Sequence, residues 1–512
     1  MVEKKSRIGF AGGAFVLMLF GLLSKIVGAV YRIPLTGIVG AEGVGLYQMV
    51  FPLYTLMLTI SSSGLPSSIS KLISQNLAKN NYKQASKILK VSLILLVSFS
   101  FLCSLFVFIF AKYIAEMQGN VNVTVCYYGL APAILFVGLI SGFRGYFQGK
   151  QKMFPSAFSG FIEQVVKMVF GLLFASKWIY KGVEWGVLGA VLGITLSEVV
   201  AFIYLFLCYI FRRKEKIIGE QSLQVDSFSK TARSILSLSV FVTLGGLIMP
   251  LTMLVDSCLV INILQKIGVS TQNATKMFGL QTGTVGSIIN MPVVLSLAIS
   301  TAILPSISYS LEKGNVCEAK KSATKAIFLT ILFALPCAIG CSLFAEPIIK
   351  LLYGRGLSLS EIKLASGLLE IAGVGVLYLA LVQVCSGILQ GMNKFIVPVI
   401  SLSVGGVVKI ILNVLLVRIP SVNIFGAEVS SVMCYLVALI INLFVLRKFN
   451  VIQLDWKILL VALFSLIIIP ARFLFEYVVN LGLNYYLALI MVVISVVILY
   501  FFFSICIIKK IF

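Results

Sequence analysis

Histidine is absent from the 512 residues, and charged residues make up only 12% of them. Without histidine, the chain cannot form a Ser-His-Asp triad, supply an imidazole general base or build most catalytic zinc sites. Soluble globular domains carry about 25% charged residues. A chain with far fewer charges and 60% hydrophobic residues is therefore expected to lie in a membrane.

Apolar segments of about 20 residues recur along the whole chain, separated by short polar stretches. A helix of this length crosses about 30 Å of hydrocarbon. The sequence therefore predicts an all-α polytopic membrane protein with about fourteen transmembrane helices. The predicted spans are 8–30, 46–64, 90–110, 122–142, 155–176, 185–210, 235–262, 278–304, 325–345, 364–389, 396–417, 425–446, 456–475 and 484–507.

Basic residues outnumber acidic residues by 41 to 18, which gives a net charge of +23. Lys and Arg gather in alternate loops, for example 71–90 and 212–216, the second of which includes Lys214 and Lys216. This alternation follows the positive-inside rule and indicates contact with anionic lipid headgroups rather than with nucleic acid. It predicts a multi-pass protein of the cytoplasmic membrane with both termini in the cytoplasm.

The ten cysteines are scattered over predicted spans and loops without the paired spacing of a metal site. The nearest pair, Cys337 and Cys341, lies within one apolar segment. The sequence therefore predicts no disulfide framework, no metal and no bound cofactor. Coupling of an activity to the membrane potential, Na⁺ or H⁺ remains open.

Two segments in the first half of the chain resemble two segments in the second half. LPSSISKLISQNLAKNNYKQASKIL, from Leu65, resembles LPSISYSLEKGNVCEAKKSATKAIF, from Leu304. FQGKQKMFPSAFSGFIEQVVKMVFGLL, from Phe147, resembles LQGMNKFIVPVISLSVGGVVKIILNVLL, from Leu389, about 242 residues later. Six predicted spans separate the copies, so these are parallel repeats related by an axis along the membrane normal.

The repeats predict two six-helix lobes, an arrangement typical of transporters in which two lobes rock around a central cavity. The first lobe is 1–233 with a basic cytoplasmic linker, the second is 234–450, and two additional helices follow in 451–512. A substrate site is expected between the lobes.

The fifth predicted span carries small and polar residues, among them Glu163 and Lys167, at three- and four-residue spacing on one helical face. The eleventh span, its repeat equivalent, presents Lys409 and Asn413 in the same way. Because Glu163 and Lys167 are four positions apart, they can neutralise each other on the helix surface. The alternative is that the lysines bind substrate.

A charge that faces lipid at the bilayer centre costs about 3 kcal/mol. Together, the charges inside the predicted spans would cost on the order of 20 kcal/mol, more than the net stability of most domains. They are therefore expected to face protein or water. These residues are Lys25, Glu163, Lys167, Glu198, Asp256, Glu370 and Lys409.

The remaining in-span charges differ in depth. Lys25 and Arg32 share one face near the outer end of the first span, where a lysine can also reach the headgroups. Asp256 and Glu370 lie in the outer thirds of their spans. Glu198 is central and has no cation within one helical turn, so it is either protonated or paired across helices.

Several motifs resemble the stage V sporulation protein B family, which belongs to the multidrug/oligosaccharidyl-lipid/polysaccharide flippase superfamily. They are GAEGVGLYQMVFP from Gly40, GLPSSISKLISQ from Gly64, SGFRGYFQGKQKMFPSAFSGFIEQVVK from Ser141, TKMFG from Thr275 and STAILPSIS from Ser300. The resemblance covers about the first ten predicted helices and fades in the last four.

The resemblance implies a flippase for an undecaprenyl-diphosphate-linked saccharide, in particular lipid II, in peptidoglycan and spore cortex synthesis. It also implies cell-wall synthesis enzymes as partners. Lipid II flippases carry several arginines in their first two spans, but here only Lys25 stands near such a place. The cations that could replace them are Lys167, Lys409 and Arg144.

Two other functions fit parts of the sequence. A multidrug exporter of the same architecture would use the in-span carboxylates Glu163, Glu198, Asp256 and Glu370 to couple transport to Na⁺ or H⁺. A membrane-embedded polyprenyl-lipid transferase would need an Asp cluster or a histidine at the interface, and the loops offer neither.

Overall fold

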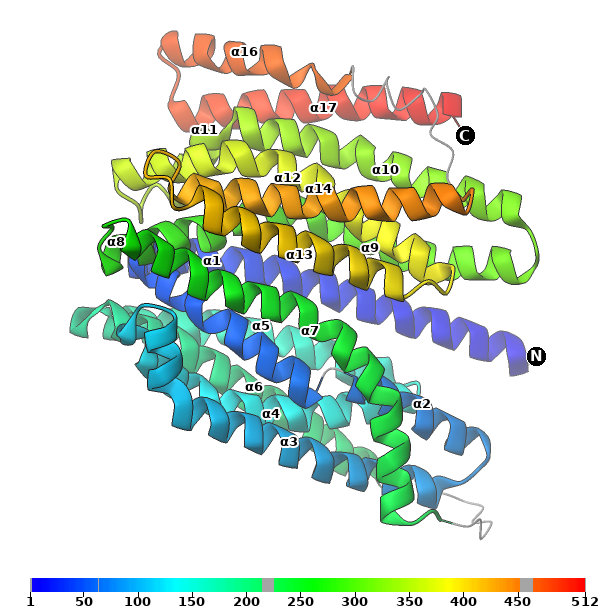
Figure 1. The fold of residues 1–512 in the computed structure, drawn as a ribbon. Helices are drawn as coiled ribbons and strands as arrows, with labels where there is room; N and C mark the ends of the chain where they lie inside the picture. Colours follow the sequence, from blue (N-terminus) through cyan, green and yellow to red (C-terminus); the bar gives the residue numbers. More distant parts are fainter. Residues whose placement is uncertain (1, 63, 214–224, 452–463, 512) are drawn as a thin grey trace. The chain divides into compact units, whose positions relative to one another are not determined.

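The computed structural model describes residues 2–62, 64–213, 225–451 and 464–511, which form helices joined by short turns, with no strands in these ranges (Figure 1). Eleven segments of these residues are helical, apolar and long enough to cross a membrane. The predicted all-helical, multi-pass class is confirmed. The linker residues Lys214 and Lys216 and the start of the predicted span 456–475 lie outside the described residues.

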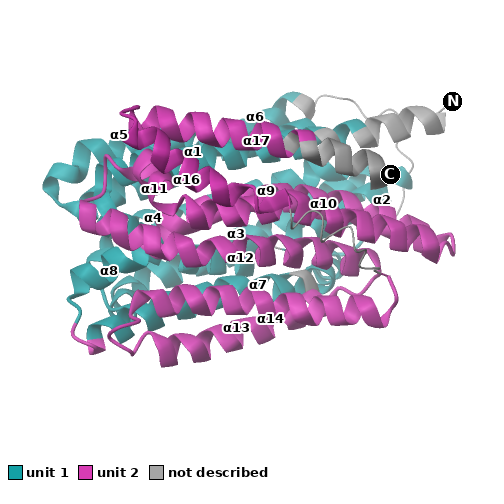
Figure 2. Ribbon diagram, turned by 90° about the horizontal axis from the view of Figure 1, so that it is seen from above, with its two compact units in different colours: residues 1–265, 269–279 teal, residues 266–268, 280–512 magenta. Residues whose placement is uncertain are grey.

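The chain forms two compact units, drawn in different colours in Figure 2. Unit 1 comprises residues 1–265 and 269–279, and unit 2 comprises 266–268 and 280–512. The predicted lobes 1–233 and 234–450, with the helix pair in 451–512, remain a prediction. The helices of unit 1 are α1 (Val2–Ser62), α2 (Leu65–Ala78), α3 (Tyr82–Met117), η1 (Val121–Val123), α4 (Thr124–Gly149), α5 (Met153–Trp178), η2 (Ile179–Lys181), α6 (Val183–Arg213), α7 (Phe228–Lys266, up to Gln265) and α8 (Thr271–Gly279).

After residues 266–268, unit 2 continues from Leu280 with a short π-helix, in which the backbone is wound more widely than in an α-helix. Its helices are η3 (Leu280–Val285), α9 (Gly286–Glu312), α10 (Val316–Leu343), α11 (Ala345–Tyr353), α12 (Leu359–Gly391), α13 (Ile396–Leu416), α14 (Ile424–Lys448), α16 (Ile468–Asn480) and α17 (Tyr485–Ile511).

Helix α1 joins the first two predicted spans without the expected loop between them. The chain stays helical on both sides of Gly40, whose φ of 67° and ψ of −176° are not helical. A residue without a side chain adopts this conformation at little cost, so one glycine is enough to redirect the helix. Both arms of α1 therefore lie in unit 1 and bring residues of the intervening stretch, such as Arg32, into the helical bundle.

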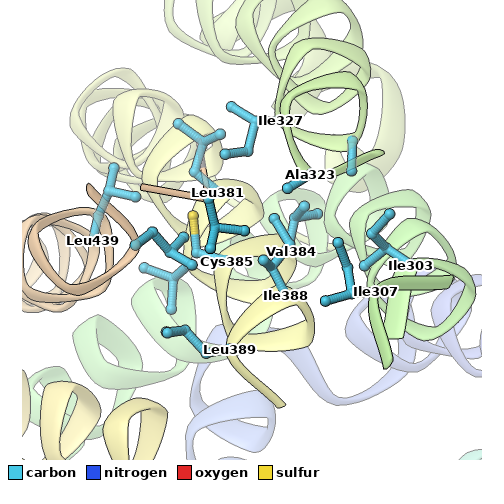
Figure 3. Packing of buried hydrophobic residues seen from close by; sticks show 14 of the residues in the cluster. Ile303, Ile307, Ala323, Ile327, Leu381, Val384, Cys385, Ile388, Leu389 and Leu439 are labelled. Atoms are coloured by element: carbon cyan, nitrogen blue, oxygen red, sulfur yellow. The ribbon is translucent and has the colours of Figure 1, made fainter. Parts of the chain in front are cut away.

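Each unit has its own apolar core. In unit 2, buried side chains of α9, α10, α12 and α14 meet around Val384 and Ile388 (Figure 3). In unit 1, α2, α3, α4 and α6 contribute the corresponding side chains, including Ile69 and Phe147. Moving one such side chain from water into an apolar core stabilises a fold by about 1.5–3 kcal/mol. Between helices in a membrane, close packing supplies much of the stabilisation instead.

The turn between α4 and α5 has the same backbone hydrogen bonds as the turn between α12 and α13. Gln151 and Asn393, which are 242 positions apart, both have positive φ, at 57° and 59°. In both turns, the N–H groups of this residue and the next donate to carbonyls of the preceding helix at 2.9 to 3.0 Å, a common way to end a helix. The predicted repeat and its offset are confirmed in these segments.

The turn between α2 and α3 likewise matches the turn between α9 and α10. Asn81 and Asn315 cap α3 and α10, each accepting a hydrogen bond from the N–H three residues later. A methyl group at Gly149 would lie 2.9 Å from Ile73 Cβ, and one at Gly391 would lie 2.9 Å from Ile307 Cβ. These equivalences give an offset of 234. Placing Leu65 opposite Leu304, as the shared Leu-Pro-Ser sequence suggested, would give an offset of about 239 and is therefore wrong by five residues. The two segments nevertheless correspond.

Helices α7 and α8 are attached to unit 1 by buried polar side chains. Gln118, which is fully buried after α3, donates to Met49 O at 3.0 Å and to Ser257 Oγ of α7 at 2.9 Å. Asn120 Nδ2 donates to Thr275 Oγ1 of α8 at 2.9 Å. Because a buried amide without partners costs about 1–3 kcal/mol, these bonds fix α7 and α8 against α1 and α3.

Two motifs that carry the family resemblance pack against each other. Gly45 of GAEGVGLYQMVFP faces the backbone carbonyl of Thr275 so closely that a methyl group there would overlap it. Gly279 of TKMFG faces the backbone of Ala41 and Gly45 in the same way. These glycines therefore allow α1 and α8 to approach at backbone distance, which is a structural role.

Candidate functional site

A cluster of charged and polar side chains lies in unit 1, on the facing sides of α1, α4, α5 and α6. Helix α5 packs on both α1 and α6, and α4 packs on α6. The polar face predicted for the fifth span is turned toward these neighbours, with Ser156 and Ser159 buried. Polar side chains inside such a bundle gain hydrogen-bond partners that lipid cannot supply.

Arg144 of α4 links α4 to α5. Its Nη2 forms a salt bridge with Glu163 Oε2 at 3.0 Å, and its Nε donates to Ser159 Oγ at 3.0 Å. The side chains of Arg144 and Glu163 are 26% and 20% exposed, so both charges are largely desolvated. Gly160 lies beside the guanidinium, since a methyl group there would be in ordinary van der Waals contact with Nη2, at 3.6 Å.

Glu163 therefore forms its salt bridge with Arg144 and not with Lys167, the partner in one of the two alternatives drawn from the sequence. Among the described residues, the salt-bridge partner of Glu163 is Arg144. Gln164 stands between the two charges, donating to Glu163 Oε1 at 3.1 Å and accepting from Lys167 Nζ. Lys167 Nζ also lies 5.8 Å from the centre of the Tyr31 ring, within range of a cation–π interaction.

Glu198 of α6 is buried, with an exposed fraction of 4%. The Tyr54 hydroxyl of α1 donates to its Oε1 at 3.2 Å. Arg144, Glu163 and Lys167 are all near enough to interact with its carboxylate through Coulomb forces. The sequence left Glu198 either protonated or paired across helices, and the structure supplies a hydrogen bond from another helix.

Three members of this cluster were not predicted: Tyr31, Tyr54 and Gln164. Gln164 had a weak signal, because it directly follows Glu163 in the polar stretch FIEQVVK. The tyrosines had none. They join the cluster because α1 remains helical up to and beyond Gly40, which brings them next to α5 and α6.

The two predicted cations of α1 lie differently. Arg32 is partly buried and interacts electrostatically with Lys167, so it borders the cluster. Lys25 is exposed, and the described contacts do not connect it to the cluster. Its helical arm packs on α5 through Phe20, whose ring lies 5.6 Å from that of Phe158.

The other predicted site residues lie outside the cluster. Asp256 of α7 is buried in unit 1. In unit 2, Glu370 of α12 is exposed, Lys409 of α13 is partly buried and Asn413 is fully buried. The substrate site expected between the lobes, with Lys167 and Lys409 as candidate ligands, involves both units and remains a prediction, as do the coupling roles of the carboxylates.

The repeat shows which members of the cluster the two units share. At the offset of 242, Lys167 corresponds to Lys409. At the same offset, Arg144 is replaced by Ser386 and Glu163 by Gly405. The lysine is therefore common to both units, whereas the salt bridge belongs to unit 1.

Helix α6 can be aligned with α14 through matched glycine contacts. Gly189 packs on the backbone where α5 passes from residue 174 to 175, and Gly426 packs on the corresponding place in α13, residues 416 and 417. This correspondence places Tyr435 of α14 at the position of Glu198. A carboxylate at this position is thus found in unit 1 and not in unit 2, although α14 has a buried carboxylate elsewhere, at Glu428.

Comparison with known proteins gives the family. The chain matches a family model described as polysaccharide biosynthesis protein over residues 10–311, and one described as MatE over residues 282–415. It is 27% identical to stage V sporulation protein B of Bacillus subtilis (strain 168) over 424 residues, which cover 83% of this chain and 80% of that protein. It is 28% identical to the lipid II flippase MurJ of the same strain over 457 residues, with coverages of 85% and 82%.

Solved structures show the same fold. A structure of the lipid II flippase MurJ in an inward closed conformation matches with a TM-score of 0.74 at 15% identity, covering 97% of this chain and 99% of that chain. The resemblance to the stage V sporulation protein B family is confirmed, and the chain is a multi-pass membrane protein with this fold. Because the first family model covers more than half of its length, the chain belongs to the polysaccharide biosynthesis protein family.

Proposed function

We propose that the protein moves an undecaprenyl-diphosphate-linked saccharide, lipid II, across the cytoplasmic membrane by alternating access. Support comes from its similarity to a lipid II flippase over most of both chains. The proposal includes a role in peptidoglycan and spore cortex synthesis, which the similarity to stage V sporulation protein B favours. Anionic lipids around the basic loops and cell-wall synthesis enzymes are the proposed partners, and both termini are placed in the cytoplasm.

The observation that carries the proposal is the position of Lys167 in the cluster. Arg144 is committed to Glu163 by a salt bridge, whereas Lys167 is held by the neutral amide of Gln164 and the ring of Tyr31. A lipid-linked diphosphate brings about two negative charges that hydrocarbon cannot stabilise. A lysine with neutral partners can exchange them for phosphate oxygens without breaking an ion pair.

In this mechanism Lys167 and Lys409 hold the diphosphate from the two repeats. Arg32 borders Lys167 and adds positive potential, while Lys25 and Asn413 are further proposed contacts. Arg144 and Glu163 position α5 relative to α4. Lysine suits transport because its ammonium is a mobile point charge, whereas the rigid fork of arginine holds phosphate more tightly and would slow release.

The test is transport of labelled lipid II by purified protein in vesicles. We expect redistribution of the label between leaflets with no change in its mass, since a transferase would change the mass. Lys167→Gln and Lys409→Gln should each lower the rate by about tenfold, corresponding to about 1.4 kcal/mol. Lys177→Gln, at an exposed lysine near the end of α5, is the matched control. Near-normal flipping by the double variant would contradict the proposal.

Export of cationic drugs is the second candidate, because the MatE model matches residues 282–415 and because Glu198 and Asp256 are buried acids. This function would rest on the carboxylates rather than on the lysines. Efflux of a cationic dye that survives Lys167→Gln but is lost in Glu198→Gln would favour it over lipid transport.

A further inference from the structure

The turn between α2 and α3, which is predicted to lie in the cytoplasm, is surrounded by lysines with no acid among them. Residues 65–90 contain five lysines and no Asp or Glu, which gives a net charge of +5. The corresponding residues of unit 2, 299–324 at the offset of 234, contain three lysines and two glutamates, which gives +1. We call the lysines of unit 1 the basic corner: Lys71, Lys79, Lys83, Lys87 and Lys90.

Neither membrane topology nor the backbone explains this difference. The repeats are parallel, so both turns lie on the same side of the membrane and the positive-inside rule applies to both. The turns also share their backbone, with Asn81 capping α3 and Asn315 capping α10. Three lysines of the basic corner are nevertheless uncharged in unit 2, and two uncharged residues are acidic there. Lys71, Lys83 and Lys90 correspond to Pro305, Cys317 and Thr324, and Ala78 and Gln84 correspond to Glu312 and Glu318.

The basic corner lies at the surface of unit 1. Four of its lysines are exposed and Lys87 is partly buried, while α2 buries its apolar face, which includes Ile69. An acid does approach the turn, because Asp226 accepts a hydrogen bond from Gln84 at 3.2 Å. Its carboxylate forms a salt bridge with Lys230 at 2.6 Å. The basic corner therefore presents most of its charge to ligands outside the chain.

Helix α4 leads from the basic corner to the charged cluster. Helices α2 and α4 approach so closely that a methyl group at Gly149 would lie 2.9 Å from the backbone of α2. The next residue, Lys150, adds a cation whose counterpart in unit 2 is the uncharged Met392. Arg144 of the cluster lies six residues earlier on the same helix, about 9 Å along its axis. Positive charge therefore continues within unit 1 from the basic corner to the cluster.

We infer that the basic corner attracts the diphosphate headgroup of the lipid substrate at the membrane surface before the headgroup reaches Lys167. The inference rests on the proposed function, which supplies the diphosphate. It goes further by naming the first contact of the substrate and by assigning that contact to unit 1. Electrostatic attraction of this kind raises the rate of association by about 10- to 1,000-fold at low ionic strength.

The charge pattern favours a diphosphate over the headgroups of ordinary anionic phospholipids. Such phospholipids are attracted by basic segments near the membrane in both units. The excess of positive charge, by contrast, is found in unit 1, which also contains Arg144 and Lys167. Coulomb attraction is proportional to the charge of the ligand. A concentrated group of lysines therefore prefers a headgroup with about two negative charges to one with about one.

The experiment measures the initial rate of lipid II flipping in vesicles of neutral phosphatidylcholine at several densities of labelled lipid II. The combined variant Lys71→Gln, Lys83→Gln, Lys90→Gln should be about tenfold slower at low density and equally fast at saturating density. A surface that acts before the substrate binds changes the dependence on concentration and not the maximal rate. The matched control removes the three lysines of residues 299–324, with Lys313→Gln, Lys320→Gln and Lys321→Gln, and should have little effect.

Salt gives a second readout that a structural role of the lysines would not change. The screening length falls from about 30 Å at 0.01 M to about 8 Å at 0.15 M ionic strength. The low-density rate of the unmodified protein should therefore fall several-fold between these conditions, and that of the combined variant should change little. A photoreactive analogue of farnesyl diphosphate in the same vesicles tests the contact directly and should label residues 65–90.

The outcomes separate the inference from the proposed function. Equal low-density rates for the unmodified protein and the combined variant overturn the inference and leave the proposed function intact. A difference that appears only when the vesicles contain anionic phosphatidylglycerol also overturns it, since the lysines would then contact bulk phospholipid. A lower maximal rate with unchanged concentration dependence would make the lysines structural. Labelling of residues 65–90 without any flipping contradicts the proposed function alone, and absence of this labelling overturns the inference in every case.

Discussion

Arg144→Met alone should destabilise the protein more than Arg144→Met combined with Glu163→Gln. In the single variant, Glu163 keeps its charge but loses the guanidinium 3.0 Å away, and only the Gln164 amide remains. In the double variant, no charge is left to compensate. Both variants lose the hydrogen bond from Arg144 to Ser159, so this loss cancels in the comparison.

The expected magnitude follows from how deeply the pair is buried. Breaking a fully buried ion pair costs about 3–5 kcal/mol, whereas an exposed pair contributes about 0–1 kcal/mol. Since the two side chains are 26% and 20% exposed, we expect a loss of about 2–3 kcal/mol for the single variant. The double variant should lose about 1 kcal/mol, mainly the bond to Ser159. Unit 2 keeps the same turn with uncharged Ser386 and Gly405 at these positions.

The assay is unfolding of the purified protein in detergent, followed by the fraction that remains monodisperse after heating. Lys230→Met is the matched control, because its salt bridge with Asp226 is formed by side chains that are 71% and 40% exposed. It should have little effect. Equal destabilisation by the single and double variants would refute the reasoning, since it would mean that the charge left on Glu163 costs nothing.

Three further predictions test other parts of the structure. The double variant Glu163→Lys, Lys167→Glu should be less abundant in membranes, as measured on immunoblots, because its new lysine at position 163 faces Arg144. Normal abundance would mean that residues 163 and 167 need only each other as charge partners. Gly45→Ala should destabilise by more than about 2 kcal/mol because its methyl group meets backbone, while Gly37→Ala, where nothing lies within 4 Å, should not. Thermal unfolding measures both, and equal stability would argue against the close approach of α1 and α8. The orientation can be tested with single cysteines in a cysteine-free chain and a thiol reagent that does not cross the membrane of intact cells. Cysteines at the predicted outer positions Asn122, Asn273 and Ser360 should react, and cysteines at the predicted inner positions Lys83 and Lys321 should not. Labelling at Lys83 would reverse the proposed orientation.

The sequence predicted those features that depend on one helix or on short-range spacing. Hydropathy identified the spans, and the 242-residue offset was recovered because the α4–α5 and α12–α13 turns need similar residues at the same places. The polar face of α5 also followed from helical spacing. By contrast, the offset of the α2–α3 repeat was misjudged, because Leu-Pro-Ser occurs in both copies at different distances from the turn.

The partners within the cluster could not be predicted, because they come from other helices. Arg144 and Glu163 lie on opposite sides of a turn, and Tyr54 and Glu198 are 144 residues apart. An i,i+4 rule applied to Glu163 and Lys167 names a partner that is available on the same helix. In a helical bundle, a cation on a neighbouring helix can bind the same carboxylate. Here the guanidinium of Arg144 forms the salt bridge with Glu163, at 3.0 Å.

The comparison of the two repeats separates residues that the fold needs from residues kept for another reason. The turns and the glycine contacts occur in both units, so the helical arrangement needs them. The arginine and both acids of the cluster are replaced in unit 2 by serine, glycine and tyrosine within the same arrangement, so the fold does not need them.

The lysine is different, because it is present in both units although a charge inside a membrane costs about 3 kcal/mol when it faces lipid. A costly residue that the fold does not require is expected to be kept for activity. Lys167→Met and Lys409→Met should therefore leave the unfolding temperature unchanged or raise it while lowering lipid transport, as vesicle assays at matched protein content would show. A loss of stability in both variants with normal transport per folded molecule would instead make the two lysines structural.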